Sequence, residues 1–126
     1  MIDQIRVFKD ATAIITGGAS GIGRTMALEL VSRGSTVILA DRQIVLAEEL
    51  AASIVADGGN AWARELDVCD YSAVQALVDE TVAKTGRLDY MFNNAGIAVG
   101  GMTHDLEVDD WDISIDVNIR GVTNGV

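Results

Sequence analysis

The chain has 126 residues and carries 9 Lys and Arg against 19 Asp and Glu, so its formal net charge is −10. This length fits one domain spanning residues 1–126, and the lack of proline leaves no rigid linker. The negative field repels polyanions, which argues against nucleic acid as a partner. Apolar residues make up 49% of the chain, enough for a buried core and too many for a disordered protein.

Three features of the sequence indicate a cytoplasmic protein. Cys69 is the single cysteine and can form no internal disulfide, which is typical of a reducing compartment. Asp3 and Arg6 place charges where a signal peptide needs an apolar stretch. No apolar run approaches the ~20 residues of a membrane span, so no membrane partner is expected.

Apolar patterning predicts strands that alternate with helices. Short apolar runs rich in β-branched residues predict strands at 11–16, 36–40, 61–66 and 88–92. Apolar residues at 3.6-residue spacing predict helices at about 21–33, 44–57, 70–86 and 108–122. Asp70 has the side chain of a good N-cap, and Gly34 and Gly86 occupy typical positions for a helix stop.

This alternation predicts an α/β fold with a parallel sheet. Strands that are mostly apolar are typical of a sheet covered by helices on both faces, which gives three layers, α/β/α. Right-handed crossovers place the first strand in the middle of a doubly wound sheet, truncated here after about four strands. Ligands of such sheets bind in the crevice at the carboxyl ends of the strands.

The turn after the first strand reads Thr16-Gly17-Gly18-Ala19-Ser20-Gly21-Ile22-Gly23. Its glycines allow a tight turn, close approach of the backbone to a ligand, and close packing of helix on strand. The next helix directs free N–H groups and its positive dipole end at the same point. A pyrophosphate site is therefore favoured over a glycine turn without a ligand. A triphosphate loop fits poorly, because no Gly-Lys-Ser/Thr follows and Arg24 stands nearest that position.

Asp41 ends the second predicted strand, 18 residues beyond Gly23. A carboxylate there can accept both hydroxyl hydrogens of an adenosine ribose and repels a 2′-phosphate, which favours NAD over NADP. Arg42 and Arg24 indicate the opposite preference, because either side chain can pair with a phosphate. Asp41 carries more weight, since a buried contact between like charges is costly.

Asp67 and Val68 follow the third predicted strand. There, a side-chain oxygen and the adjoining backbone could meet the amino group of adenine. Taken alone, Asp67 is more often a turn or strand-end aspartate without a ligand.

Four blocks occur in order along the chain: Thr16–Gly23, Asp67-Val68, Asn93-Asn94-Ala95-Gly96, and Asn118 within Val117-Asn118-Ile119-Arg120-Gly121-Val122. Together they resemble the main branch of the short-chain dehydrogenases/reductases, over the whole chain from Val7 to Val126. The resemblance implies a Rossmann-like fold and hydride transfer between a nicotinamide dinucleotide and a small alcohol or carbonyl compound. It also implies a homodimer or homotetramer.

The same resemblance implies roles for individual residues, and no metal site is expected. The pyrophosphate would lie among Gly17, Ser20, Gly21, Ile22 and Gly23. Asp41, with Arg42 beside it, would hold the adenosine ribose, and Asp67 and Val68 would flank adenine. The path toward the nicotinamide ribose would be lined by Asn94, Ala95 and Gly96, with the Asn side chains tying down the fourth strand.

Asn118 is similar to the catalytic asparagine of this family. That asparagine kinks its helix and helps to hold a water molecule in the proton relay. The alternative is a polar residue inside a helix whose side chain is bonded locally.

The chain departs from the family pattern after Asn118. Members of the family use a Ser and a Tyr-x-x-x-Lys pair downstream of this asparagine, and the chain reaches only Val126. Tyr71 and Tyr90 have no Lys four positions later, and His104 lies in a polar loop without a partner in sequence. We therefore expect the N-terminal half of a longer enzyme, or its ordered part, with an open edge at the fourth strand and no turnover by itself.

Two other functions stay open at this stage. The missing Tyr and Lys would permit a non-catalytic module that binds a dinucleotide and regulates or scaffolds. A methyltransferase also places a glycine turn before an acidic strand end, but the Asn93–Gly96 block argues against it.

Overall fold

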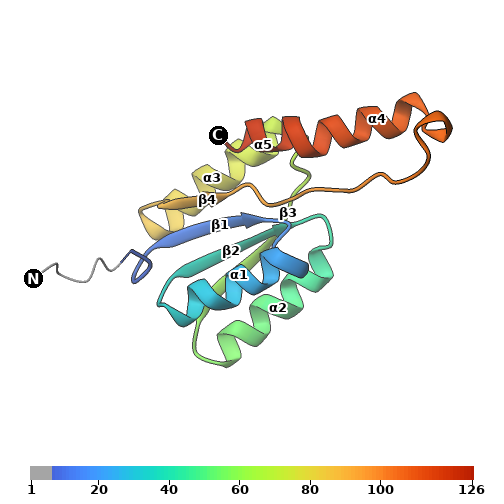
Figure 1. The fold of residues 1–126 in the computed structure, drawn as a ribbon. Coiled ribbons are helices and arrows are strands. Elements are labelled where there is room, and N and C mark those ends of the chain that lie inside the picture. Colours follow the sequence, from blue (N-terminus) through green and yellow to red (C-terminus); the bar gives the residue numbers. More distant parts are fainter. Residues whose placement is uncertain (1–6) are drawn as a thin grey trace, which may run out of the picture.

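The structure, a computed structural model, describes residues 7–126, so the charged residues Asp3 and Arg6 lie outside it. Strands and helices alternate along this part of the chain (Figure 1). The strands are β1 (Thr12–Thr16), β2 (Thr36–Asp41), β3 (Asn60–Glu65) and β4 (Tyr90–Phe92). The helices are α1 (Gly21–Ser32), α2 (Ile44–Ala56), α3 (Tyr71–Thr85), α4 (Val108–Ile115) and α5 (Gly121–Asn124). A 3-10 turn (Thr103–Asp105) precedes α4, and a π-helical turn (Asp116–Arg120) joins α4 to α5.

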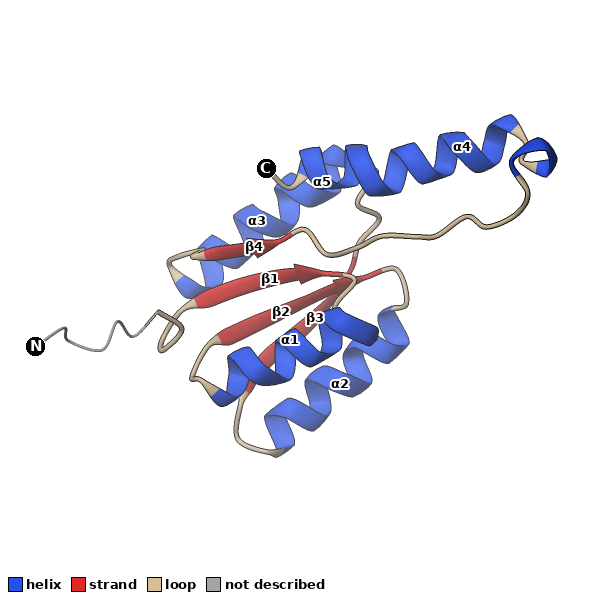
Figure 2. Cartoon of the chain, in the orientation of Figure 1, coloured by secondary structure: helices blue, strands red, loops and turns tan. Residues whose placement is uncertain are grey.

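The strands form one four-stranded sheet in the order β3-β2-β1-β4, and every neighbouring pair is parallel. Helices α1 and α2 cover one face, while α3 and the segment from α4 to α5 lie on the other side (Figure 2). The predicted three-layer α/β/α sheet with β1 in its interior is therefore confirmed. The described residues include no helix with both the length and the apolar character needed to cross a bilayer.

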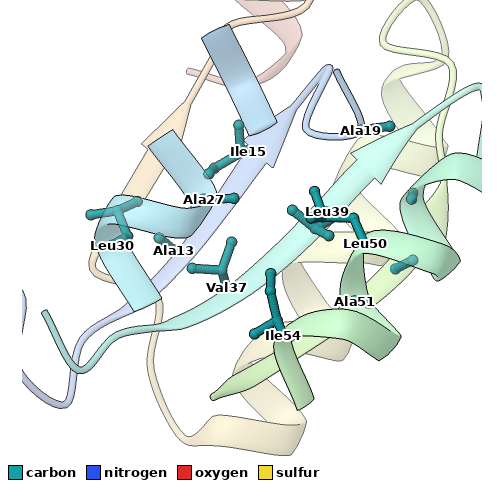
Figure 3. Close-up of a cluster of buried hydrophobic side chains, with 12 residues drawn as sticks. Ala13, Ile15, Ala19, Ala27, Leu30, Val37, Leu39, Leu50, Ala51 and Ile54 are labelled. Carbon is teal, nitrogen blue, oxygen red and sulfur yellow. The ribbon is translucent and has the colours of Figure 1, made fainter. Parts of the chain in front are cut away.

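The two faces of β1 and β2 build two separate hydrophobic cores. Ala13 and Ile15 pack with Leu30 of α1 and Ile54 of α2 in the first core (Figure 3). Ile14 packs in the second core, against the side of the sheet that α3 covers. Because neighbouring side chains of a strand point to opposite faces, one continuous apolar run fills both cores.

An ion-pair network joins the edge strand β3 to α3. The Arg64 guanidinium donates to both carboxylate oxygens of Glu80, with 2.9 Å from Nε to Oε2, and Lys84 Nζ lies 2.7 Å from Glu80 Oε1. Hydrogen bonds from Arg64, and then from Lys84, lower the pKa of Glu80 to about 2. The Lys84 ammonium also lies 5.3 Å from the ring centroid of Trp62, which packs beside the second core.

Predicted strand boundaries change where side chains replace ladder bonds. The fourth strand begins at Tyr90 instead of 88, because the Asp89 carboxylate accepts the Thr12 N–H at 2.8 Å in place of a backbone carbonyl. Hydrogen bonds from Arg87 and then from Thr12 lower the pKa of Asp89. The third strand is Asn60–Glu65 instead of 61–66.

The helix predicted over 108–122 is present, but a π-helical turn interrupts it around Asn118, where the resemblance implied a kink. α-Helical bonding stops at Ile115, and the Gly121 N–H reaches back five residues to the Asp116 carbonyl. The apolar side of this segment is open to solvent at Trp111, which is 50% exposed. Ile22 is 74% exposed because the first turn of α1 borders a cavity.

Replacing Asp10 with Gly is expected to stabilise the protein. Asp10 has φ 62°, the one positive φ outside glycine in the described chain, and an L-residue pays about 1 kcal/mol there. Urea unfolding should show a gain close to that value. Lys9→Gly in the same turn is the control and should lower stability, since glycine only adds freedom to the unfolded chain. A loss of stability in Asp10→Gly would contradict the interpretation.

Glu80 is expected to make stability depend on acid pH. Its pKa is depressed from 4.5 to about 2, so its contribution is complete above pH 4.5 and is lost as the pH falls toward 2. Glu80→Gln should cost about 1 kcal/mol at pH 7, because the network is partly exposed, and the gap from wild type should close toward pH 2. Glu49→Gln, on the exposed side of α2, is the control in urea unfolding at each pH. A gap that does not change with pH would refute this.

Candidate functional site

A cavity of about 680 Å³ opens at the carboxyl ends of the parallel strands. Apart from Gly23, every residue that the sequence predicted for cofactor binding lines it: Gly17, Ser20, Gly21, Ile22, Asp41, Arg42, Asp67, Val68, Asn94, Ala95 and Gly96. Four further lining residues were missed: Gln43, Leu66, Ile97 and Val117. Each of the four is next in sequence to a predicted site residue, and this adjacency could have identified them as lining residues.

The glycine turn is shaped by close backbone contacts. A Cβ on Gly23 would overlap the Gly17 carbonyl oxygen and lie 2.8 Å from Asn94 Nδ2, so Gly23 serves the packing of α1 on β1 and β4. Gly17 has φ 66°, and a Cβ there would lie 3.0 Å from the Cα of Ala95. Gly21 has φ 52° and nothing within 4 Å of its Cβ position, which leaves open space beside the cavity.

The amino end of α1 presents free donors to this space. The first helical bond runs from the Arg24 N–H to the Ser20 carbonyl at 3.1 Å, so the amides before Arg24 have no partner within the helix. Ser20 is the N-cap residue, but its hydroxyl caps no amide of the helix. Its side chain lines the cavity beside these amides. This arrangement fits an anion with several oxygens, because unpaired N–H groups and the helix dipole favour negative charge there.

Asp41 connects the end of β2 to the glycine turn. Its carboxylate is 9% exposed; Oδ2 accepts the Ala19 N–H at 3.0 Å, and Oδ1 accepts the Gln43 N–H at 2.9 Å. A carboxylate oxygen has more than one lone pair, so both oxygens keep acceptor capacity for hydroxyl groups in the cavity. The bond to Ala19 was not predictable from the sequence, because it joins residues 22 positions apart.

Asp67 makes a turn bond and also borders the cavity. Its Oδ1 accepts the Cys69 N–H at 2.9 Å, the local bond of an aspartate turn, while the residue also lines the cavity. Burial, and then the hydrogen bond with Asp67, raise the pKa of the Cys69 thiol, which keeps this thiol protonated. Val68 next to it is buried and forms part of the same wall.

Thr16 and Asn94 join the ends of β1 and β4. The Thr16 hydroxyl accepts the Asn94 and Ala95 N–H groups, each at 3.0 Å, and donates to the Phe92 carbonyl. Asn94 Nδ2 donates to the Thr16 carbonyl at 3.0 Å and to the Gly17 carbonyl at 3.3 Å. Asn94 therefore ties β4 to the glycine turn, and Thr16 is a supporting residue that the sequence did not single out.

Asn118 holds the loop after β4. Its Oδ1 accepts the Ile97 N–H at 2.8 Å and its Nδ2 donates to the Ile97 carbonyl at 2.9 Å, with a longer bond to Ser114 Oγ. The residue lies in the π-helical turn, where the resemblance implied a kink. Its amide thus bonds mainly to a distant segment, and the bond to Ser114 is its local one.

Other polar side chains stay away from the cavity. Tyr71 is exposed on α3, and the Tyr90 hydroxyl donates to the Val7 carbonyl at 2.7 Å. His104 Nε2 lies 3.6 Å from the exposed carboxylate of Asp105. Within residues 7–126, none of these three side chains lines the cavity.

Comparisons with known proteins extend over most of the chain. An uncharacterized oxidoreductase of Listeria monocytogenes is 36% identical over 94% of this chain and 48% of its own length. Meso-2,3-butanediol dehydrogenase of Serratia marcescens is 36% identical over 91% of this chain and 45% of its own length. The crystal structure of a short chain dehydrogenase/reductase from Burkholderia phymatum in complex with NAD superposes with a TM-score of 0.91 at 34% identity, over 94% of this chain and 42% of that one.

The chain thus spans less than half the length of these relatives. Its parallel sheet is Rossmann-like, and its fold is similar to that of the Burkholderia phymatum structure. The short chain dehydrogenase family model matches residues 11–126, which include the glycine turn, Asp41, the Asn93–Gly96 block and Asn118. From these matches and from the cavity that its motifs form, the chain belongs to the short-chain dehydrogenase family of oxidoreductases.

Proposed function

We propose that residues 1–126 form one cofactor-binding domain of an enzyme that transfers a hydride between NAD and a secondary alcohol or ketone. The observation that carries the proposal is the position of Asp41 in the same cavity as the glycine turn. Family membership and the name of the Serratia marcescens relative, a dehydrogenase acting on a diol, support the reaction class. The complete enzyme would be a cytoplasmic homodimer or homotetramer acting on a small molecule.

The residues of the cavity fit a dinucleotide by size and chemistry. The open space beside Gly21 and the free amides of α1 accommodate a pyrophosphate, and the buried side chains of Leu66 and Val68 offer apolar surface to adenine. Asn94, Ala95 and Gly96, held by Thr16 and Asn118, form the wall toward the nicotinamide end. When bound, the nicotinamide ring supplies or accepts the hydride.

The preference for NAD follows from the surroundings of Asp41. Its two carboxylate oxygens hold backbone N–H groups, so the ionised group is fixed at the cavity wall. A 2′-phosphate would have to approach this buried carboxylate, and the repulsion between like charges is costly where one of them is buried. Arg42 lines the cavity and remains available to a phosphate, whereas Arg24 is not among the lining residues within 7–126.

Proton transfer belongs to another part of the enzyme in this proposal. By resemblance, a Ser and a Tyr-x-x-x-Lys pair would position the substrate and move its proton. Asn118 would contribute by fixing the loop at Ile97. The domain of residues 1–126 would then bind NAD without catalysing turnover.

Replacing Asp41 with Ala is expected to weaken NAD binding about tenfold and to improve the relative affinity for NADP, since both the ribose acceptor and the opposing charge disappear. Asp41→Asn keeps an acceptor for the Ala19 N–H, so it should lose less NAD affinity while still tolerating NADP better. Glu65→Ala is the matched control, because Glu65 pairs in register with Asp41 but lies outside the cavity lining. Titration calorimetry with both dinucleotides gives the ratio; an unchanged ratio in Asp41→Ala would defeat the assignment.

Gly23→Ala is expected to lower both stability and NAD affinity. The added Cβ overlaps the Gly17 carbonyl, and relieving such overpacking costs about 2 kcal/mol while displacing the glycine turn. Gly100→Ala is the control, since nothing lies within 4 Å of its Cβ position. Thermal unfolding and NAD titration of both variants provide the comparison. If Gly23→Ala matches Gly100→Ala in both measurements, the packing role of Gly23 is refuted.

A further inference from the structure

The carboxyl-terminal helix α5 contacts the wall of the cavity that follows β3. Asn124 Nδ2 donates to the Val68 carbonyl at 2.9 Å, across 56 positions of sequence. Gly121 is buried one helical turn earlier, and a Cβ there would overlap Val68 Cγ2. Because residues three apart lie on one side of a helix, Gly121 and Asn124 contact the same residue together.

Val68 receives this contact at a point where the chain has no regular structure. It lies after β3 and before α3, and the turn bonds on either side of it are made by Asp67 with Cys69 and Asp70. The Val68 side chain is 6% exposed and lines the cavity, while its carbonyl accepts from Asn124. The position of this wall therefore depends on a donor that comes from α5.

We propose that Asn124 is a positioning residue for the adenine end of the cofactor site. By holding the Val68 carbonyl, it fixes Val68 and the neighbouring Asp67 against the cavity, and it does so without touching the ligand itself. Gly121 allows the backbone of α5 to approach closely enough for this bond to form. This inference rests on the proposed function, because it assigns adenine to the wall formed by Asp67 and Val68.

The geometry makes this role selective for one end of the cavity. The opposite wall at Ile97 is held by Asn118 from the preceding π-helical turn, through bonds that do not involve Asn124. Loss of the Asn124 amide should release Val68 and leave the Asn118–Ile97 contact in place. Binding of an adenine nucleotide should then weaken, whereas binding of a nicotinamide nucleotide should not.

The test compares AMP, nicotinamide mononucleotide and NAD in calorimetric titrations of the full chain. Asn124→Asp keeps the size of the side chain but removes the amide donor, and Asn124→Gln keeps an amide donor. Thr123→Ala is the control, because the exposed Thr123 hydroxyl donates only to the Arg120 carbonyl of its own helix. We expect Asn124→Asp to weaken AMP and NAD about fivefold each, the effect of one ordinary hydrogen bond, and to leave nicotinamide mononucleotide unchanged.

Asn124→Gln should bind AMP more tightly than Asn124→Asp, and Thr123→Ala should match wild type. An unchanged AMP affinity in Asn124→Asp overturns the inference, as does an equal loss for AMP and nicotinamide mononucleotide, which would mark a general structural effect. Equal AMP affinities in the Asp and Gln variants overturn it as well. If the unsubstituted chain binds neither NAD nor AMP, the proposed function fails, and that outcome is distinct from failure of the Asn124 role.

Discussion

The glycine turn, the start of α1 and the end of β4 meet at the carboxyl end of β1. Glycine allows this close approach because it has no side chain. The Gly17 carbonyl lies where a Cβ of Gly23 would be, and Asn94 Nδ2 donates to the carbonyls of Thr16 and Gly17 from the other side. This contact sets the direction in which α1 leaves the sheet and the distance between the glycine turn and β4. The cavity keeps its shape because neither the glycine turn nor the end of β4 can move without breaking the hydrogen bonds of Asn94.

The same contact explains how a strongly acidic chain can present a site for an anion. A formal charge of −10 acts over the whole surface, where salt screens it within about 10 Å. At the amino end of α1, unpaired amides point at one place and cost no reorganisation when an anion arrives. Asp41 is the one lining carboxylate tied into this turn by a backbone bond, and in the proposed function it faces the ribose instead of the pyrophosphate.

The segment from α4 to α5 serves the site while lying mostly outside it. Its apolar side is open at Trp111, yet its other side bonds to Ile97 through Asn118 and to Val68 through Asn124. The two cavity walls that these residues hold belong to different loops, one after β3 and one after β4. One helical segment thereby bonds to both of the loops that line the cavity.

The sequence by itself determined the order and type of the elements, because these depend on local periodicity and local bonds. The Asp70 side chain accepts the Ala73 N–H at 3.0 Å and starts α3, as its position in the sequence indicates. The alternation of apolar strands with amphipathic helices likewise specified a parallel sheet, and the glycine turn indicated the edge of the sheet at which the cavity lies.

Tertiary structure alone decided which groups hold the site together. The bonds from Ala19 to Asp41, from Ile97 to Asn118 and from Asn124 to Val68 join residues 22, 21 and 56 positions apart. No periodicity encodes such pairs, since each depends on how the strands are ordered and on how closely a glycine lets two backbones approach. The exposure of Ile22 is also a tertiary property, because it depends on the cavity beside the first turn of α1.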